Sequence, residues 1–345
     1  MMGAWYWFED AENADPIALF SIARRIRNID GLPFPVRLKP DEKDALNRRI
    51  AAALSQFDGS LTATSMRLLY PYQTAALAER FTVSPGFAAA TEGTALITSE
   101  NEDLSIMLGD EDHVRLQAVA PGLQPEAALQ RTAPYDAFLN RTFRFAFDSK
   151  LGYLNRSPAN IGTGMRASVV LHLPALSRAG ALPALSSAVA SLGLSIKGAY
   201  GDGLSVKGDL YRISNKLTMG ISEEEAVGNL KSMCLQLATK ERRTAETLAA
   251  DIRLRDRIQR ASSVLAGAVL LTTNEALELL SLIRFGALYG QCDFDLSAVN
   301  MLLITVQPAN INCLVGARLS ASERDELRAK FVRKKLFPAE DAQKE

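Results

Sequence analysis

Four arginines beside predicted turns have the residue type and placement that best fit a chemical role. Arg25 and Arg27 lie in "ARRIRN", Arg115 follows the acidic turn "GDEDH", and Arg166 follows the glycine-rich turn "GTGM". Arginines at strand ends and in loops can converge on a phosphate chain, because the planar guanidinium makes bidentate, charge-assisted contacts. Each arginine alone is typical of a solvated surface, whereas the four together predict a polyphosphate site.

The turn "GDEDH" places three carboxylates before His113. One of them could bind a cation or act as a general base, although the residues alone favour an ordinary solvated hairpin turn. A metal site is almost excluded, because His113 and His172 are the only histidines and lie in different predicted elements. The GxxxxGK[ST] and GxGxxG nucleotide motifs and the nucleophile elbow of serine hydrolases are also missing.

The C-terminal segment "SASERDELRA" is a third candidate. Ser320 and Glu323 form a capping box, which predicts Arg324 and Asp325 in the first turns of a helix. Arg324 and Arg328 have i, i+4 spacing and share a face, and a helix N-terminus with two arginines suits a phosphate. A solvated charged helix is the alternative.

Strands and helices are both expected to position these residues. Apolar and polar residues alternate on both sides of "GDED", which predicts two strands joined by the acidic turn, and further strands are predicted at "ASVVLHLPAL", "LSIKGAY" and "LYRISN". The segment "DPIALFSIARRIRN" has helical or mixed spacing, and Ser222 and Glu225 form a capping box that begins a helical C-terminal part. The pattern predicts an α+β fold, with a central antiparallel sheet flanked by helices and an all-helical C-terminal domain.

The composition predicts a cytoplasmic protein of two domains. We divide the 345 residues into 1–245, with a small and mostly helical part up to about residue 85, and 246–345, at the polar stretch "ATKERRTAET". Lys+Arg and Asp+Glu number 39 each, so no overall field would recruit nucleic acid or a membrane. Three widely spaced cysteines, no signal peptide and no long apolar run indicate a reducing compartment.

Long stretches of the chain resemble motifs of the phosphagen (guanidino) kinases, and they follow one another in the same order as in that family. They are "ARRIRNIDGLPFP", "SENEDLSIMLGDEDHVRLQ", "RSPANIGTGMRASVVLHLPAL" and "KGAYGDGLSVKGDLYRISNKLTMGISEEEAVGNLKSM". The bacterial protein arginine kinases are the most similar branch, because "QPANINCLVGARLSASERDELRA" resembles their helical C-terminal domain. The resemblance runs from about Trp5 to Leu336 and implies the guanidino-kinase fold, with ATP and Mg²⁺ as cofactors.

The resemblance also implies roles for individual residues. Arg25, Arg27, Arg115 and Arg166 stand at phosphate-clamping positions, and Glu111 matches a glutamate that holds the acceptor guanidinium and helps to deprotonate it. Other positions implied to bind the nucleotide are Ala167, Ser168, Val169, Val170, Gly201 and Asp202. The "RDELRA" motif matches a phosphoarginine pocket made of Arg324, Asp325, Arg328 and Ala329.

Several positions depart from the family pattern. Ser157 stands at the position of the active-site cysteine, Ser205 at that of a second substrate glutamate, and Phe81 at that of a histidine near the nucleotide. Gly109 and Asp110 replace an asparagine and a glutamate. Each missing charged hydrogen bond would cost about 1.5–3 kcal/mol, so the two serines together predict activity lowered by several orders of magnitude.

The leading hypothesis is an ATP-dependent protein arginine kinase. By resemblance it would act in the stress response, mark proteins for a Clp-type protease, work with a zinc-finger activator protein and form a homodimer. The second hypothesis is a weak or inactive pseudokinase that binds phosphoarginine through "RDELRA". A kinase for free arginine is the third, against which the C-terminal extension argues.

Overall fold

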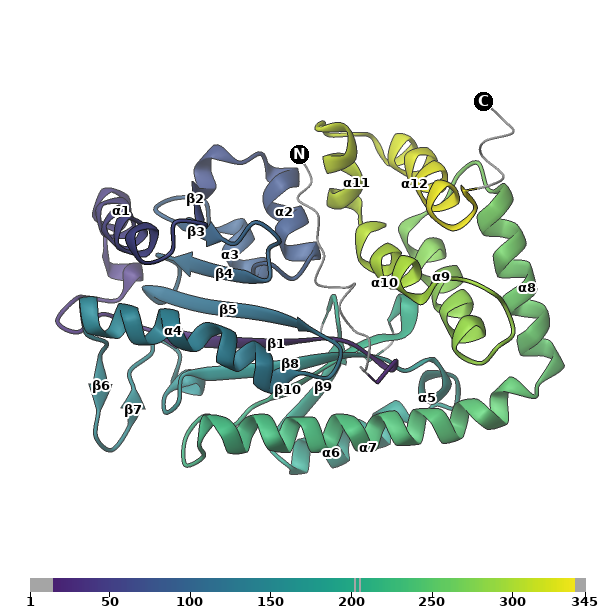
Figure 1. The fold of residues 1–345 in the computed structure, drawn as a ribbon, viewed down its shortest axis with the longest axis horizontal. Helices are drawn as coiled ribbons and strands as arrows, with labels where there is room; N and C mark the ends of the chain where they lie inside the picture. Colours follow the sequence, from purple (N-terminus) through teal and green to yellow (C-terminus); the bar gives the residue numbers. More distant parts are fainter. Residues whose placement is uncertain (1–14, 202, 205, 339–345) are drawn as a thin grey trace.

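A computed structural model describes residues 15–338 of the chain except residues 202 and 205 (Figure 1). Within these residues, one eight-stranded antiparallel sheet has the order β2-β3-β4-β5-β1-β8-β10-β9, and β6 pairs with β7 in a separate hairpin. The strands are β1 (Ala18–Arg27), β2 (Thr62–Ser65), β3 (Ala95–Thr98), β4 (Leu104–Leu108), β5 (Val114–Pro121), β6 (Phe147–Asp148), β7 (Gly152–Tyr153), β8 (Met165–His172), β9 (Leu194–Gly198) and β10 (Leu210–Asn215).

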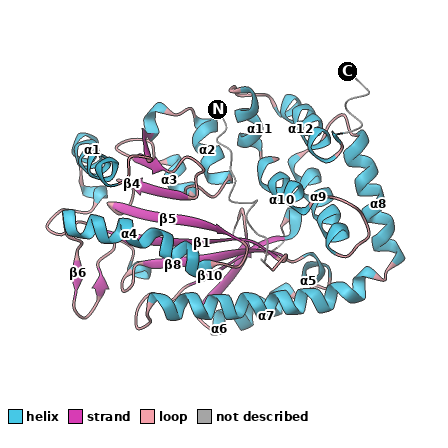
Figure 2. Ribbon diagram, viewed as in Figure 1, coloured by secondary structure: helices cyan, strands magenta, loops and turns pink. Residues whose placement is uncertain are grey.

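Helices cover the two faces of the sheet unequally. They are α1 (Pro40–Phe57), α2 (Pro71–Glu79), α3 (Pro85–Ala89), α4 (Pro125–Phe143), α5 (Pro174–Arg178), α6 (Leu182–Ser191), α7 (Glu223–Ala249), α8 (Ile252–Gly267), α9 (Thr273–Leu288), α10 (Leu296–Thr305), α11 (Pro308–Val315) and α12 (Ala321–Leu336). Two hydrophobic clusters join α1, α4, α6 and α7 to one face. Figure 2 shows α4 and the long α7 running beside the sheet. The α+β architecture with a helical C-terminal part is therefore confirmed.

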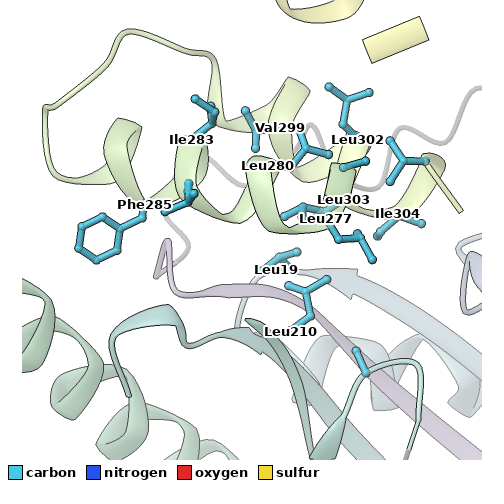
Figure 3. Close-up of a cluster of buried hydrophobic side chains, with 14 of the residues drawn as sticks. Leu19, Leu210, Leu277, Leu280, Ile283, Phe285, Val299, Leu302, Leu303 and Ile304 are labelled. Carbon is cyan, nitrogen blue, oxygen red and sulfur yellow. The ribbon is translucent and has the colours of Figure 1, made fainter. Parts of the chain in front are cut away.

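The second face is covered only at its ends. Met66, Leu77 and Phe87 pack against the β3–β4 side of the sheet. The C-terminal helices pack over the starts of β1 and β10, where side chains of α9 and α10 meet Leu19 and Leu210 (Figure 3). Between the two clusters, this face of the sheet carries mainly polar and charged side chains.

The helical or mixed reading of the segment before residue 28 is wrong. Ala18–Arg27 forms β1, which lies in the middle of the sheet between β5 and β8. β1 is buried along most of its length and carries arginines on both faces, so its sequence shows no alternation of apolar and polar residues. The N-terminal part therefore supplies a central strand of the sheet as well as helices.

The predicted domain boundary near residue 245 falls inside a helix. Helix α7 continues to Ala249 and α8 begins at Ile252. The capping box of Ser222 and Glu225 begins α7, as the sequence predicted. The division of the chain at 245 stays a prediction.

None of the described helices is by itself long and apolar enough to cross a bilayer. Only the α10–α11 pair reaches the required length and hydropathy, and the two helices are bent by 94°.

Candidate functional site

Five cations project from the less covered face of the sheet. Arg24 on β1 lies directly opposite Arg166 on β8, and Arg212 on β10 lies opposite Lys197 on β9. Arg115 on β5 pairs with Ile26, which shares a face with Arg24 because side chains alternate along a strand. We call Arg24, Arg115, Arg166, Lys197 and Arg212 the cation face.

Two adjoining cavities open on the cation face. The larger, of about 640 Å³, is lined by Arg24, Phe81, Tyr200 and Arg212 among others. The smaller, of about 310 Å³, is lined by Arg24, Arg166, Lys197 and Arg212 among others. Because Arg24 and Arg212 line both cavities, one elongated anion could contact both of them.

The electrostatics of Arg24 favour an anionic ligand. Its guanidinium donates to Oε1 of Gln117, a neutral partner. The pKa of Arg24 is lowered, first by burial and then by the like charges of Arg115, Arg212 and Arg166. A cluster of cations that destabilise one another gains most from a bound polyanion.

Arg115 and Arg166 are held in place by further hydrogen bonds. Nη1 of Arg115 donates to Ser84 and to Asp110, and its buried Nε has no hydrogen-bond partner in the described part of the chain. Arg166 donates to the backbone carbonyls of Ala159, Asn215 and Lys216, and burial lowers its pKa. Carbonyl partners orient the Arg166 guanidinium without neutralising its charge.

Arg25 and Arg27 do not join this cluster, so the predicted convergence of Arg25, Arg27, Arg115 and Arg166 is wrong. Arg25 and Arg27 project from the opposite face, because residues one or three positions from Arg24 alternate to the other side. Arg25 forms an ion pair with Glu223 at 2.6 Å, and Arg27 lies 2.9 Å from a carboxylate oxygen of Asp136 and 3.4 Å from Glu223. Both arginines are buried and already matched by carboxylates.

The sequence analysis missed three members of the cation face. Arg24 stands next to Arg25, and Lys197 and Arg212 lie inside the predicted strands "LSIKGAY" and "LYRISN". The signal that identifies them is the period of two once their segments are read as strands. With that reading, Arg24 shares a face with Ile22 and Ile26, and Arg25 does not.

Replacing Glu223 with alanine is expected to destabilise the fold by about 3 kcal/mol, because it leaves buried Arg25 without its carboxylate. Urea denaturation measures the change. Glu326→Ala, which removes an exposed ion pair with Lys330, is the control and should cost less than about 1 kcal/mol. Equal effects of the two variants would contradict a structural role for the Glu223 pairs.

Two loops meet at the edge of the cation face. The side-chain amide of Asn28, just after β1, donates to Asp112 at 2.7 Å and to the carbonyl of Leu154 at 3.0 Å, and its Oδ1 accepts from the backbone N–H of His113. Asp112 also accepts from the backbone N–H of Arg156 at 2.9 Å. These bonds hold the acidic turn against the loop that carries Ser157.

Glu111 lies in this acidic turn and is half exposed. One of its oxygens accepts from Nη1 of Arg156 at 3.0 Å, and the other lies 3.8 Å from Nη2 of Arg115. The carboxylate is therefore next to the cation face and open to solvent. His113, by contrast, is buried, accepts from Ile29 N–H, and has its pKa lowered to about 4 by burial.

Packing of the chain against itself accounts for the two glycines of the Ser157 loop, Gly162 and Gly164. A Cβ on Gly162 would lie 2.0 Å from the carbonyl oxygen of Thr218, and one on Gly164 would lie 2.7 Å from that of Ile26. Both also have positive φ, so close packing of the chain against itself requires glycine.

The residues expected to bind the nucleotide lie partly at the two cavities and partly in the hydrophobic core. Ala167 and Ser168 line the smaller cavity, whereas Val169 and Val170 are buried in hydrophobic clusters on opposite faces. Gly201 lines the larger cavity. The predicted site residues Asp202 and Ser205 lie outside the described residues.

Phe81 gives the larger cavity an aromatic wall. Its ring centroid lies 5.0 Å from those of Phe20 and Tyr200. Phe81 has a φ of 64°, which is uncommon for a residue with a side chain. An aromatic surface next to a cationic one suits a planar base joined to phosphates.

The "RDELRA" motif lies at a third cavity, between α2 and the α11–α12 region. Arg324 lines this cavity of about 710 Å³ together with Tyr72 and Arg318. Arg328 is buried and donates to the carbonyls of Val306 and Leu271 and to Asp325, all at 2.6–2.7 Å. Ala329 is buried in the core. The structure therefore does not bring Arg324 and Arg328 together as one open clamp.

Among the described residues, no group of three His, Cys, Asp or Glu side chains is placed to hold a metal ion. His172 is buried and hydrogen-bonded to Ser281 and Arg284, away from both cavities.

Comparisons with known families match both parts of the chain. The family model for the C-terminal catalytic domain of ATP:guanido phosphotransferases matches residues 45–244. The model for the C-terminal domain of the protein-arginine kinase McsB matches residues 251–345.

Curated relatives match almost the whole chain. It is 35% identical over 336 residues to the protein-arginine kinase of Halothermothrix orenii, covering 96% of each protein. It is 36% identical over 341 residues to that of Moorella thermoacetica, covering 96% of this chain and 97% of the relative.

Solved structures share the fold at lower identity. A lombricine kinase has a TM-score of 0.58 and 23% identity, covering 69% of each chain. A duplicated taurocyamine kinase from Schistosoma mansoni has a TM-score of 0.60 and 20% identity, covering 88% of this chain and 47% of that one.

Proposed function

The chain belongs to the ATP:guanido phosphotransferase family, and from this we propose that it transfers the γ-phosphoryl group of ATP to arginine side chains of proteins. The single observation that carries the proposal is the cation face, with its two cavities and aromatic wall. The relatives named protein-arginine kinase and the match to their C-terminal domain support a protein acceptor.

The cation face would hold the phosphates of the nucleotide. Arg24, Arg166 and Arg212 line the shared cavities, and phosphoryl transfer depends mainly on positioning and on stabilising the charge of the transferring group. Phe81 and Tyr200 would pack against the base. Mg²⁺ commonly binds ATP phosphates with only one or two carboxylates, and when bound it neutralises part of the phosphate charge.

Glu111 would hold and deprotonate the acceptor. A guanidinium is protonated at neutral pH and is a poor nucleophile until one nitrogen is oriented and gives up a proton. Glu111 is open to solvent and 3.8 Å from Arg115, so its carboxylate can receive an arginine from another protein beside the phosphate site.

Ser157→Cys is expected to raise kcat at least about tenfold, because a thiolate supplies a charged hydrogen bond that a hydroxyl cannot. Ser157 is part of the loop held beside Glu111 through Asp112 and Arg156. Steady-state kinetics with an arginine peptide measure the change, and Ser157→Ala, which has neither a hydroxyl nor a thiol, serves as the control. A cysteine variant no faster than the alanine variant would argue against an electrostatic role for this position.

Identification of the phosphorylated product tests the proposed function. The purified chain is incubated with Mg·ATP and either an unfolded protein or free arginine, and products are identified by mass spectrometry without acid treatment. We expect phosphoarginine on the protein and little on free arginine. Rapid turnover of free arginine would instead support a phosphagen kinase, and no phosphoarginine in either reaction would refute the transferase activity.

The alternative is a pseudokinase that binds phosphoarginine through "RDELRA". The replacement of the active-site cysteine by Ser157 and the cavity beside Arg324 motivate it. Calorimetry with phosphoarginine is expected to detect binding that Arg324→Ala removes. Arg328→Ala cannot serve as the binding test, because Arg328 is buried and holds α12 against Val306 and Leu271. No heat of binding to the wild-type chain would eliminate this alternative.

The wider role follows from the family resemblance. We propose a cytoplasmic stress-response protein that marks substrates for a Clp-type protease, acts with a zinc-finger activator and forms a homodimer. Substrate capture, activation by the partner and sedimentation of the purified chain test these parts separately.

A further inference from the structure

Arg156 places one of the chain's own guanidinium groups on the carboxylate that would receive the acceptor. Its Nη1 donates to Oε1 of Glu111 at 3.0 Å. The other oxygen of Glu111 lies 3.8 Å from Nη2 of Arg115, a member of the cation face. The guanidinium of Arg156 is therefore separated from the proposed phosphate site by a single carboxylate.

The backbone of Arg156 is fixed by a hydrogen bond, whereas its side chain can leave Glu111 and return to it. The backbone N–H donates to Asp112, a buried carboxylate that also accepts from Asn28. The side chains of Arg156 and Glu111 are 44% and 48% exposed, and ion pairs of this exposure contribute little to stability. The arrangement presents a guanidinium at the site without locking it there.

We propose that Arg156 is a modification site that the chain phosphorylates in cis. This inference rests on the proposed function. Nη1 of Arg156 forms a bond to the γ-phosphorus of ATP, and the bond between that phosphorus and the β–γ bridging oxygen breaks. ADP leaves with the electron pair, and the proton lost from Nη1 passes to Glu111.

Two physical effects determine when Arg156 is modified and what the modification changes. An acceptor tethered beside the phosphates reacts without being captured from solution, so Arg156 is modified before protein substrates. Phosphorylation then replaces a positive charge with a negative one, which Glu111 repels. Glu111 becomes available to an arginine of another protein.

Site mapping in the full-length chain tests this inference. The chain is incubated with Mg·ATP and a peptide carrying one arginine, samples are kept near neutral pH, and both products are mapped by mass spectrometry. We expect phosphate on Arg156 before it accumulates on the peptide, at an initial fractional rate that does not change when the protein is diluted. Arg156→Lys removes this signal. Arg144→Lys, which changes an exposed arginine paired with Asp30, leaves it unchanged.

The outcomes separate this inference from the proposed function. Phosphorylated peptide with unmodified Arg156 would overturn the inference and leave the function standing. A fractional rate that falls on dilution would show transfer between molecules and contradict the step in cis. Modification of neither product would contradict both proposals.

Discussion

Replacing Arg24 with methionine is expected to lower kcat/KM for Mg·ATP by about 100- to 1,000-fold, because one clamping group of the phosphate site is lost. The same replacement of its neighbour Arg25 should leave the nucleotide kinetics of the folded protein unchanged. The two residues are adjacent on β1 and project from opposite faces. Steady-state kinetics at varied Mg·ATP measure both variants.

The two variants should also differ in stability, and here Arg25→Met should have the larger effect. Burial and three neighbouring cations disfavour the charged form of Arg24, so Arg24→Met is expected to leave the midpoint of thermal unfolding unchanged or to raise it. Arg25→Met breaks a buried ion pair with Glu223 and should lower it. A variant pair in which Arg25→Met alone loses nucleotide turnover would show that the phosphates bind on the other face.

Glu111→Gln is expected to lower kcat by about 10²- to 10⁴-fold, the usual contribution of a general base. Glutamine has the size of glutamate but cannot accept the guanidinium proton. The KM for Mg·ATP should change little, because Asp110 still pairs with Arg115 at 3.3 Å. Initial rates with an arginine peptide at saturating nucleotide measure the effect.

Glu100→Gln is the matched control for that variant. Glu100 is an exposed carboxylate in the turn before β4, at the opposite end of the strand from Glu111. Its replacement should leave kcat unchanged. A Glu111→Gln enzyme as fast as the Glu100→Gln enzyme would exclude Glu111 as the base.

Much of the fold could be predicted from local pattern. Alternation around "GDED" identifies β4 and β5, and the capping boxes at Ser222 and Ser320 mark the starts of α7 and α12. β1 could not be recognised in this way, because a strand buried on both faces has no alternation to detect. Its place between β5 and β8 depends on pairings far apart in the sequence.

The site was harder to predict than the fold for the same reason. Residue type and the family resemblance indicated an arginine clamp, but the choice among Arg24, Arg25 and Arg27 depends on which face each occupies. That choice is fixed by the pairing of Arg24 with Arg166. Burial of Arg328 could not be foreseen either, because its partners Val306 and Leu271 lie outside the motif.

Phosphorus NMR tests the proposed transfer most directly. The wild-type chain is mixed with Mg·ATP and a peptide carrying one arginine. We predict that a phosphoramidate resonance grows as the γ-phosphate resonance of ATP declines, and that Arg24→Met suppresses both changes. Loss of the γ-phosphate resonance with growth of inorganic phosphate alone, or no change in either resonance, would contradict phosphoryl transfer to arginine at the cation face.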